Sequence, residues 1–143
     1  MQTQRGTTML ELVAVLAVVA VLAAVTVPGA ARVRSAVSGA EGARRLALVL
    51  RTAQAQAQSA GEPVRVEVSS AGDYAVMRSS GAVIMSGGIG ATVSSTYPGG
   101  ALEFAARGWA GLPGSSSPRA GHFSIAGSAR TVVLQLSGCV RCS

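Results

Sequence analysis

The sequence predicts an α+β fold, in which a long N-terminal helix packs on a C-terminal antiparallel β-sheet domain. Three observations support this prediction: an apolar run near the N-terminus, a helix-period stripe behind it, and a change to period two after Pro63. At 143 residues, the chain has room for one small domain plus one further element. We therefore expect one extended helix followed by one sheet domain.

The apolar run covers residues 10–27 and is interrupted only by Glu11 and Thr26. A helix of this length spans about 27 Å, close to the roughly 30 Å hydrocarbon core of a bilayer. The run exceeds the apolar core of about 7–15 residues in a secretory signal. Three interpretations compete: a cleaved signal peptide, a plain membrane anchor, and an anchor in which Glu11 has a partner. A carboxylate in a spanning helix implies such a partner, because inserting it alone costs about 2–3 kcal/mol or more.

A second helical pattern follows Pro28 and continues to about Ala60. Its apolar residues recur at helical spacing, which predicts one face that covers a sheet. They are Leu46, Val49, Leu50, Ala53 and Ala57. Gly39 and Gly42 predict a bend or a loosened turn in the middle of this helix. The Gly-Glu-Pro sequence that begins at Gly61 predicts its end.

Strand patterns begin after Pro63, where apolar and polar residues alternate. The strands that we expect lie at 64–68, 74–77, 82–85, 89–93, 102–104, 123–125 and 131–136. The Gly, Ser and Pro residues of 108–121 predict a loop. The sequence therefore predicts one antiparallel sheet that packs on the C-terminal half of the helix.

The chain carries twelve Arg, no Lys and six acidic residues, which gives a net charge of +6. A basic balance is typical of proteins that meet nucleic acids or anionic surfaces. The Arg residues are spread along the whole chain, however, and this dispersion favours a solvated surface. His122 is the only histidine and has no nucleophile near it in sequence, so we expect neither a catalytic site nor an enzyme. Two Cys and one His are too few for a zinc site, and we expect no cofactor and no metal.

Cys139 and Cys142 are the only cysteines and form a Cys-x-x-Cys pair near the C-terminus. A redox pair normally begins a helix in a thioredoxin-like unit, and a metal site lacks further ligands. We favour the third interpretation, a structural disulfide in an oxidising compartment. It carries a geometric condition, because residues three apart in an extended strand are about 10 Å apart and point to opposite faces. A bridge needs Cα atoms within about 7 Å, so residues 140 and 141 must form a turn.

The residues around Arg5 and Gly6, in the sequence RGTTMLELV, resemble the cleavage and methylation motif of type IV prepilins. The resemblance implies that a prepilin peptidase cuts after Gly6 and methylates the new N-terminus at Thr7. Glu11 then lies five residues into the mature chain, where it can neutralise the new ammonium on its own helix or on a neighbouring subunit. Pro28 falls where pilins commonly carry a helix-kinking proline. Thr7 departs from the usual Phe, whereas cleavage depends chiefly on Gly6.

This resemblance implies a type IV pilin-like fold and a filament built with other pilins or pseudopilins. It divides the chain into a leader peptide at 1–6, a transmembrane helix at 7–28, an extramembrane part of the helix at 29–61 and a β-rich globular domain at 62–143. It places the chain in the inner membrane as a single-pass protein with a periplasmic C-terminal domain. The Arg residues behind the helix outnumber Arg5 before it, which the positive-inside rule reads as the opposite orientation. Because long domains translocate largely regardless of charge, we follow the motif, with the leader inside and the domain outside.

The globular part resembles the family that contains the H-type pseudopilin of type II secretion and the FimT-like minor pilins. The residues that carry the resemblance are 55–68, 102–108 and 129–141. In the last of these segments, family members often show Gly-Arg-x-Arg, a motif that grips DNA in some DNA-uptake pilins. Cys139 replaces the first of these two arginines, so Arg141 remains, and Arg130 or Arg119 is left to substitute. The loss of one phosphate-facing cation should weaken electrostatic binding to DNA.

These features support three hypotheses of different classes. The first is a minor pseudopilin that joins the short periplasmic filament of type II secretion. The second is a FimT-like minor type IV pilin that binds DNA during natural transformation, with Arg130 and Arg141 as candidate DNA-binding residues. The third is a redox accessory that uses the cysteine pair. The first two share the motifs that are clearest in the sequence, so the sequence leaves the choice between them open.

Overall fold

The computed structural model describes residues 9–143, and within helix α1 the side chains of residues 24–36 are outside this description. Helix α1 runs Met9–Ala60. The chain divides into two compact units, Met1–Arg34 and Ser35–Ser143. The helix ends where the sequence predicts, because Gly61 has a φ of 68°. Glycine adopts this left-handed conformation without strain, and it commonly follows the last residue of a helix.

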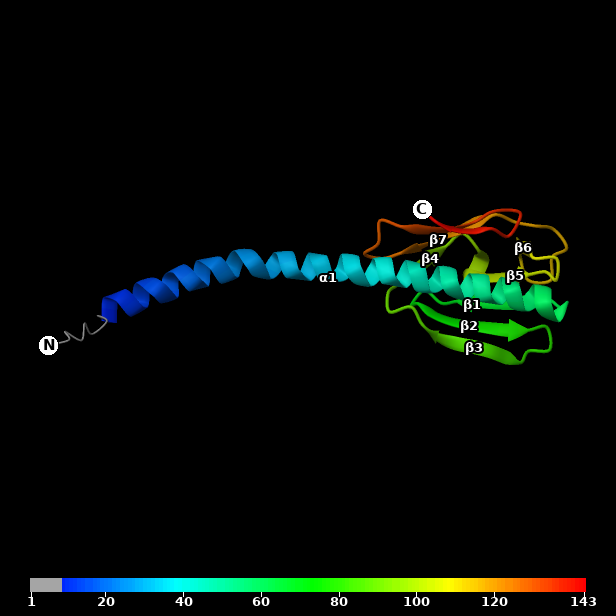
Figure 1. Ribbon diagram of the computed structural model, residues 1–143, viewed down its shortest axis with the longest axis horizontal. Coiled ribbons are helices and arrows are strands. Elements are labelled where there is room, and N and C mark those ends of the chain that lie inside the picture. Colours follow the sequence, from blue (N-terminus) through cyan, green and yellow to red (C-terminus); the bar gives the residue numbers. More distant parts are fainter. Residues whose placement is uncertain (1–8) are drawn as a thin grey trace. The chain divides into compact units, whose positions relative to one another are not determined.

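The second unit combines the C-terminal part of α1 with two antiparallel sheets. One is five-stranded with the order β3-β2-β1-β5-β6, and the other is four-stranded with the order β4-β7-β8-β9. The elements after the helix are β1 (Val64–Val68), β2 (Asp73–Arg78), β3 (Val83–Gly88), β4 (Val93–Ser95), η1 (Pro98–Gly100), β5 (Ala101–Phe104), β6 (Ala110–Gly111), β7 (Gly121–Ile125), β8 (Thr131–Leu134) and β9 (Val140–Cys142). Figure 1 shows β1, β2 and β3 along one side of this part of α1, and β4 and β7 along the other.

One hydrophobic core joins this part of α1 to both sheets. All five apolar residues of the predicted helical stripe are buried, which confirms the stripe as the packing face. The strands contribute every second residue, as expected for sheets with one covered face. In β1, Val64, Val66 and Val68 are buried, and in β7 Phe123 and Ile125 are buried. Each side chain of this size contributes about 1.5–3 kcal/mol when it is removed from water.

The two glycines in the middle of α1 allow a close approach between the helix and the sheets. The chain stays helical through both of them, so the expected loosened turn is wrong. A Cβ at Gly39 would lie 2.5 Å from the carbonyl carbon of Gly127, in the β7–β8 turn. A Cβ at Gly42 would lie 2.9 Å from Cγ2 of Ile89. The missing side chains therefore make room for neighbouring segments of the fold.

Three further features differ from the expectation of a single sheet. The candidate strand at 89–93 is largely a connection, in which the Ile89 amide donates to the carbonyl oxygen of Gly72 at 2.8 Å. The expected loop at 108–121 contains the short strand β6, which pairs with β5. The sequence predicts no strand at Val140–Cys142, yet β9 pairs with β8 in antiparallel register. These local pairings split the strands into two sheets around one core.

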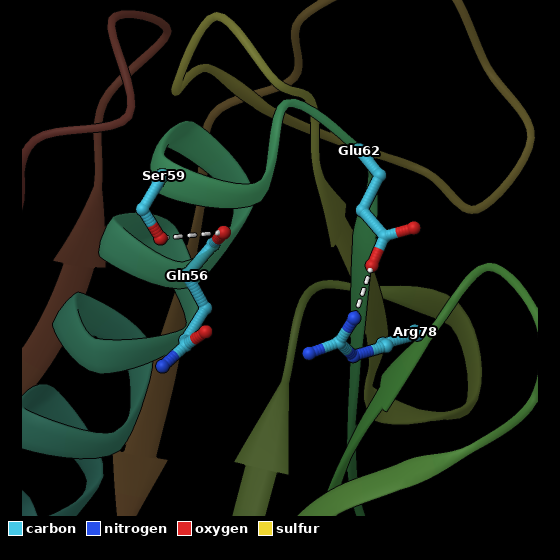
Figure 2. Close-up of polar contacts among 4 residues, drawn as sticks. All are labelled: Gln56, Ser59, Glu62 and Arg78. Carbon is cyan, nitrogen blue, oxygen red and sulfur yellow. Dashed lines mark hydrogen bonds and ion pairs between the residues drawn. The ribbon is translucent and has the colours of Figure 1, made fainter.

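The five-stranded sheet carries charges of both signs that meet in ion pairs. Nη1 of Arg78 lies 3.1 Å from Oε1 of Glu62. Figure 2 draws this ion pair as a dashed line. Arg65 pairs with Glu67 along β1. Figure 2 also shows the last turn of α1, where Oγ of Ser59 donates to a backbone carbonyl at 3.2 Å. Exposed ion pairs contribute about 0–1 kcal/mol each to stability. Their main consequence here is that they neutralise part of the positive charge of this sheet.

Candidate functional site

The residues expected for N-terminal processing lie mostly outside the described part of the chain. Gly6 and Thr7 precede the first described residue, and the side chain of Pro28 is also outside the description, although its backbone lies within α1. Glu11 is described, in the first turn of α1, and it is exposed.

Apart from Glu11, the N-terminal segment of α1, residues 9–23, is apolar on every side and exposed throughout. Its large apolar side chains expose between 55% and 85% of their surface. A helix that is apolar all round is typical of a segment that is covered by protein or by lipid. Among the residues whose side chains are described, no helical stretch of 18 residues is apolar enough to count as a membrane span. The span expected at 7–28 extends beyond those residues at both ends.

The C-terminal segment of α1, residues 37–60, presents an outward face opposite the buried stripe. Its exposed residues include Val37, Glu41, Arg44, Arg45, Leu48 and Arg51. Leu48 leaves 64% of its surface exposed although it lies at the centre of a packed helix. The sequence offered a signal for this face, because Leu48 falls outside the apolar stripe.

A groove of about 280 Å³ lies beside Leu48, between α1 and strand β3. Tyr74 and Met85 line it together with two glycines of β3. Nη1 of Arg45 reaches across one end and donates to the carbonyl oxygen of Gly88 at 3.1 Å. The groove is thus an apolar depression with a cation at its rim, on the outward face of the helix.

Arg141 lies in the middle of β9, where it is exposed and alternates with buried Val140. The strand register places it opposite Val133, which in turn lies opposite His122 in β7. These three residues form a row across the outer face of the four-stranded sheet. Arg130 immediately precedes β8, three positions from the centre of that row, so it lies about 10 Å away along the strand. The two predicted DNA-binding residues therefore lie in and beside the same sheet without being neighbours.

The four-stranded sheet differs from the five-stranded sheet in its charge. Strands β4, β7, β8 and β9 contain no acidic residue, while Arg141 lies in β9 and Arg130 immediately precedes β8. Among the described residues, the ion pairs involve Arg65 and Arg78, both in the five-stranded sheet. The Arg residues around the four-stranded sheet therefore keep their positive field, which attracts anions.

Both cysteines are free thiols in this structure. Cys139 is exposed after the β8–β9 turn, while Cys142 is half-buried in β9. Sγ of Cys142 lies 3.6 Å from the carbonyl oxygen of Ala43, in α1. Because Val140–Cys142 is extended and paired with β8, the turn that a disulfide between the two requires is not formed here.

The described part of the chain contains no group of three or more His, Cys, Asp or Glu side chains that could hold a metal ion. His122 lies at the edge of an open groove on the four-stranded sheet. Its amide donates to Oγ1 of Thr96 at 2.9 Å, and its carbonyl accepts from the Thr96 amide at 3.1 Å. These contacts hold two strands together, as expected for an ordinary strand residue.

Comparison with solved structures shows a pilin fold. The chain is similar to the type IV minor pilin FimU of Pseudomonas aeruginosa in one crystal form, with 18% sequence identity and a TM-score of 0.59 over 71% of this chain and 90% of that chain. In a second crystal form, the values are 18% identity and a TM-score of 0.61 over 73% and 87%. The similarity confirms the predicted α+β arrangement of an N-terminal helix on antiparallel strands.

No curated protein sequence is significantly similar to the chain. The family model of the type II transport protein GspH matches residues 42–138, which cover most of the second unit. This match confirms the resemblance to the pseudopilin and minor pilin family, whose fold and family role are those of structural pilins. The chain belongs to the GspH family of type II transport proteins.

Proposed function

We propose that the chain is a minor pseudopilin, a structural subunit of the periplasmic pseudopilus of type II secretion. One observation supports this function best: a packed domain of the GspH family carries an N-terminal helical segment that is apolar all round and exposed. An exposed apolar surface of this size marks a site of assembly with protein or lipid. A filament subunit that is anchored in the inner membrane before assembly would cover this surface with lipid first and with other subunits afterwards.

In this proposal, a prepilin peptidase cuts after Gly6 and methylates the new amine at Thr7. The mature chain is held in the inner membrane by 7–28, with 29–61 and the β-rich domain at 62–143 in the periplasm. Glu11 then neutralises the ammonium of a neighbouring subunit and sets the register between subunits. Pro28 adapts the helix to its neighbours in the filament.

The outward face of residues 37–60 supplies the periplasmic contacts between subunits. Leu48 and the adjacent groove offer apolar surface, while Arg44, Arg45 and Arg51 provide cations for acidic neighbours. The groove is too small and too open to bury a large ligand, and it suits a single apolar side chain of a neighbouring pseudopilin.

The full chain, co-expressed with prepilin peptidase and the other pseudopilins, tests this function. Gly6→Val should retain the leader, which intact mass measures directly. Glu11→Ala should lower recovery of the chain in crosslinked filaments on the order of tenfold, while Glu41→Ala, an exposed acid on the same helix, should leave recovery unchanged. Normal processing of Gly6→Val, or equal recovery of both Glu variants, would contradict the proposal.

A second candidate function is DNA binding by a FimT-like minor pilin during natural transformation. The acid-free four-stranded sheet favours it, since its unpaired Arg residues can neutralise phosphates. Arg141 lies on this sheet and Arg130 immediately precedes its strand β8, and the row that contains Arg141 also includes His122. Because Cys139 replaces the first of the two arginines of the family motif, we expect weaker binding to DNA than in a two-arginine motif.

Salt titration separates the two functions. The full chain in neutral detergent is titrated with duplex DNA at several salt concentrations, beside Arg141→Ala and the control Arg65→Ala. A DNA-binding pilin should show affinity that falls steeply with salt, and Arg141→Ala should lower the slope by about one unit. Arg65 is paired with Glu67 on the other sheet, so its loss should leave the slope unchanged. An absence of binding at low salt would rule out this second function.

A further inference from the structure

The β8–β9 hairpin is closed by a tight turn. The Gly138 amide donates to the carbonyl oxygen of Gln135 at 2.9 Å, and the Gln135 amide donates to that of Cys139 at 3.0 Å. Gly138 has a φ of 83°, and a Cβ there would collide with the carbonyl oxygen of Gly108. Glycine is therefore required at this position, and the turn holds Cys139 at the exposed start of β9.

The outer edge of β9 is fastened to helix α1. Nη2 of Arg51 donates to the carbonyl oxygen of Val140 at 3.0 Å. Val140 itself is 5% exposed and belongs to the core. At the other end, the Cys142 thiol approaches the carbonyl oxygen of Ala43. The strand thus closes the four-stranded sheet against the helix, and both cysteines lie within or beside it.

The paired strand keeps the two thiols apart. Residues 140–142 are extended, and the pairing continues to Ser143, whose amide and carbonyl both bond to Thr131. Residues three apart in such a strand are about 10 Å apart and point to opposite faces. Consistent with this alternation, Cys139 is exposed while Cys142 faces the helix. A disulfide needs Cα atoms within about 7 Å, so it is incompatible with β9 in place.

We propose that Cys139 and Cys142 form a redox switch, in which their disulfide closes only when β9 detaches from β8 and α1. Oxidation then holds the strand open and exposes the edge of β8, a row of backbone groups that can pair with a strand from another chain. Reduction lets β9 return. The inference requires only a disulfide donor, so it stands independently of the secretion and DNA-uptake functions.

The reaction is a thiol–disulfide exchange in two steps. The exposed Cys139 thiolate attacks one sulfur of a donor disulfide, forming a mixed disulfide and releasing the first donor thiolate. When β9 opens, the Cys142 thiolate attacks the sulfur of Cys139 and releases the second donor thiolate. The two cysteines lose two protons and two electrons in total, and the donor disulfide takes up both electrons as it becomes a dithiol. Cys139 is exposed and can react in the first step. Cys142 is half-buried, so the second step requires β9 to detach.

The bond is expected to be easily reduced. Closing it sacrifices the pairing of β9 and the burial of Val140, so the folded arrangement favours the dithiol. Disulfides whose formation works against the fold have more oxidising potentials and are the labile ones.

Hydrogen exchange on the full chain in detergent tests the switch. The chain is oxidised with excess oxidised glutathione, and peptide mass identifies the product that is 2 Da lighter, the two hydrogens lost in the reaction. In that product, the amides that bond across the β8–β9 pair, those of Thr131, Val133, Arg141 and Ser143, should exchange at least about tenfold faster than in the dithiol, while those of β1 should not change. Dithiothreitol should restore the slow exchange. An intramolecular disulfide with β9 still protected would overturn the proposal.

The rate of closure gives a second test. Arg51→Ala removes the hydrogen bond to Val140 and should speed the second step on the order of tenfold, as the loss of one charge-assisted bond predicts. Arg44→Ala, on the exposed face of the same helix, should leave the rate unchanged. Equal rates in both variants would show that closure does not depend on β9 opening, and a failure to form any intramolecular bond would also reject the switch. Unchanged exchange in β1 checks that Arg51→Ala remains folded.

Discussion

Helix α1 contains two segments that are both rich in Ala, Val and Leu but are buried in opposite ways. Residues 9–23 are exposed on every side, whereas residues 37–60 bury one stripe in the domain core and expose the rest. The difference lies in arrangement, because apolar residues surround the first segment and recur at helical spacing in the second. One segment therefore stabilises this domain, and the other is available to partners or lipid.

The comparison predicts its largest stability effect at Leu50, which is fully buried in the second segment. Leu50→Ala should lower the free energy of unfolding by about 2–5 kcal/mol, since it leaves a cavity among packed strands. Leu48→Ala, two positions away and 64% exposed, should change it by less than about 0.5 kcal/mol. Urea unfolding followed by Trp109 fluorescence measures both, because Trp109 lies in the second unit and is the only tryptophan. Equal effects would mean that the stripe is not the packing face.

The substitution Gly39→Ala tests whether the second segment packs closely against the sheets, because close packing reverses the direction of its expected effect on stability. Ala is a better helix former than Gly by about 1 kcal/mol, so Gly39→Ala would stabilise a helix without close neighbours. The contact with Gly127 predicts the opposite, a loss of about 1–3 kcal/mol from overpacking. A rise in the melting temperature of this variant would show that the helix does not approach the β7–β8 turn closely.

Ionisation of Tyr97 should destabilise the second unit at alkaline pH. Burial raises the pKa of Tyr97 above its usual value, and the nearby Arg119 offsets part of that rise. The folded state therefore holds the phenol proton to higher pH than the unfolded chain does. The contribution of Tyr97 to the free energy of unfolding should be fully present below about pH 10, and it should be lost as the pH rises through the folded pKa of Tyr97. Tyr97→Phe should weaken this fall in urea titrations between pH 9 and about 11, and an unchanged pH dependence would exclude Tyr97 as its source.

The smallest effect is expected in the exposed segment. Leu16→Ala should alter the free energy of unfolding of the second unit by less than about 0.5 kcal/mol, because Leu16 is 64% exposed and has no place in the core. The same urea titration of the full chain in detergent measures it. A decrease in the free energy of unfolding as large as that of Leu50→Ala would show that residues 9–23 also stabilise the second unit.

Much of this arrangement was predictable because it depends on local periodicity. The end of α1 at Ala60 follows from glycine and proline at 61 and 63, and β1 has the bounds that alternation predicts. The buried stripe was also predictable, since helical spacing alone selects its face. The sequence predicted the family as well, through short motifs that the family model confirms.

The features that were not predictable depend on contacts between distant residues. A loosened turn was expected at Gly39 because the residue that packs against it, Gly127, is far away in sequence, and no local pattern indicates the contact. Strand β9 escaped detection because three residues show no clear period, and its pairing with β8 gives it structure. The charge difference between the sheets also needed the topology, because sequence alone does not assign strands to sheets. For the candidate site, the topology places Arg141 in β9 and Arg130 just before its partner strand β8, and no sequence pattern indicated the groove beside Leu48.

The attachment of β9 to α1 also has a consequence for the timing of folding. Arg51 and Val140 are 89 residues apart, and Ala43 and Cys142 are 99 apart. Contacts of such long range form late, because the entropy of closing the loop must be overcome first. At about 5–20 residues per second, a ribosome needs roughly 4–18 s to extend the chain from Arg51 to Val140. The domain thus stays incomplete until the last few residues of the chain have been made.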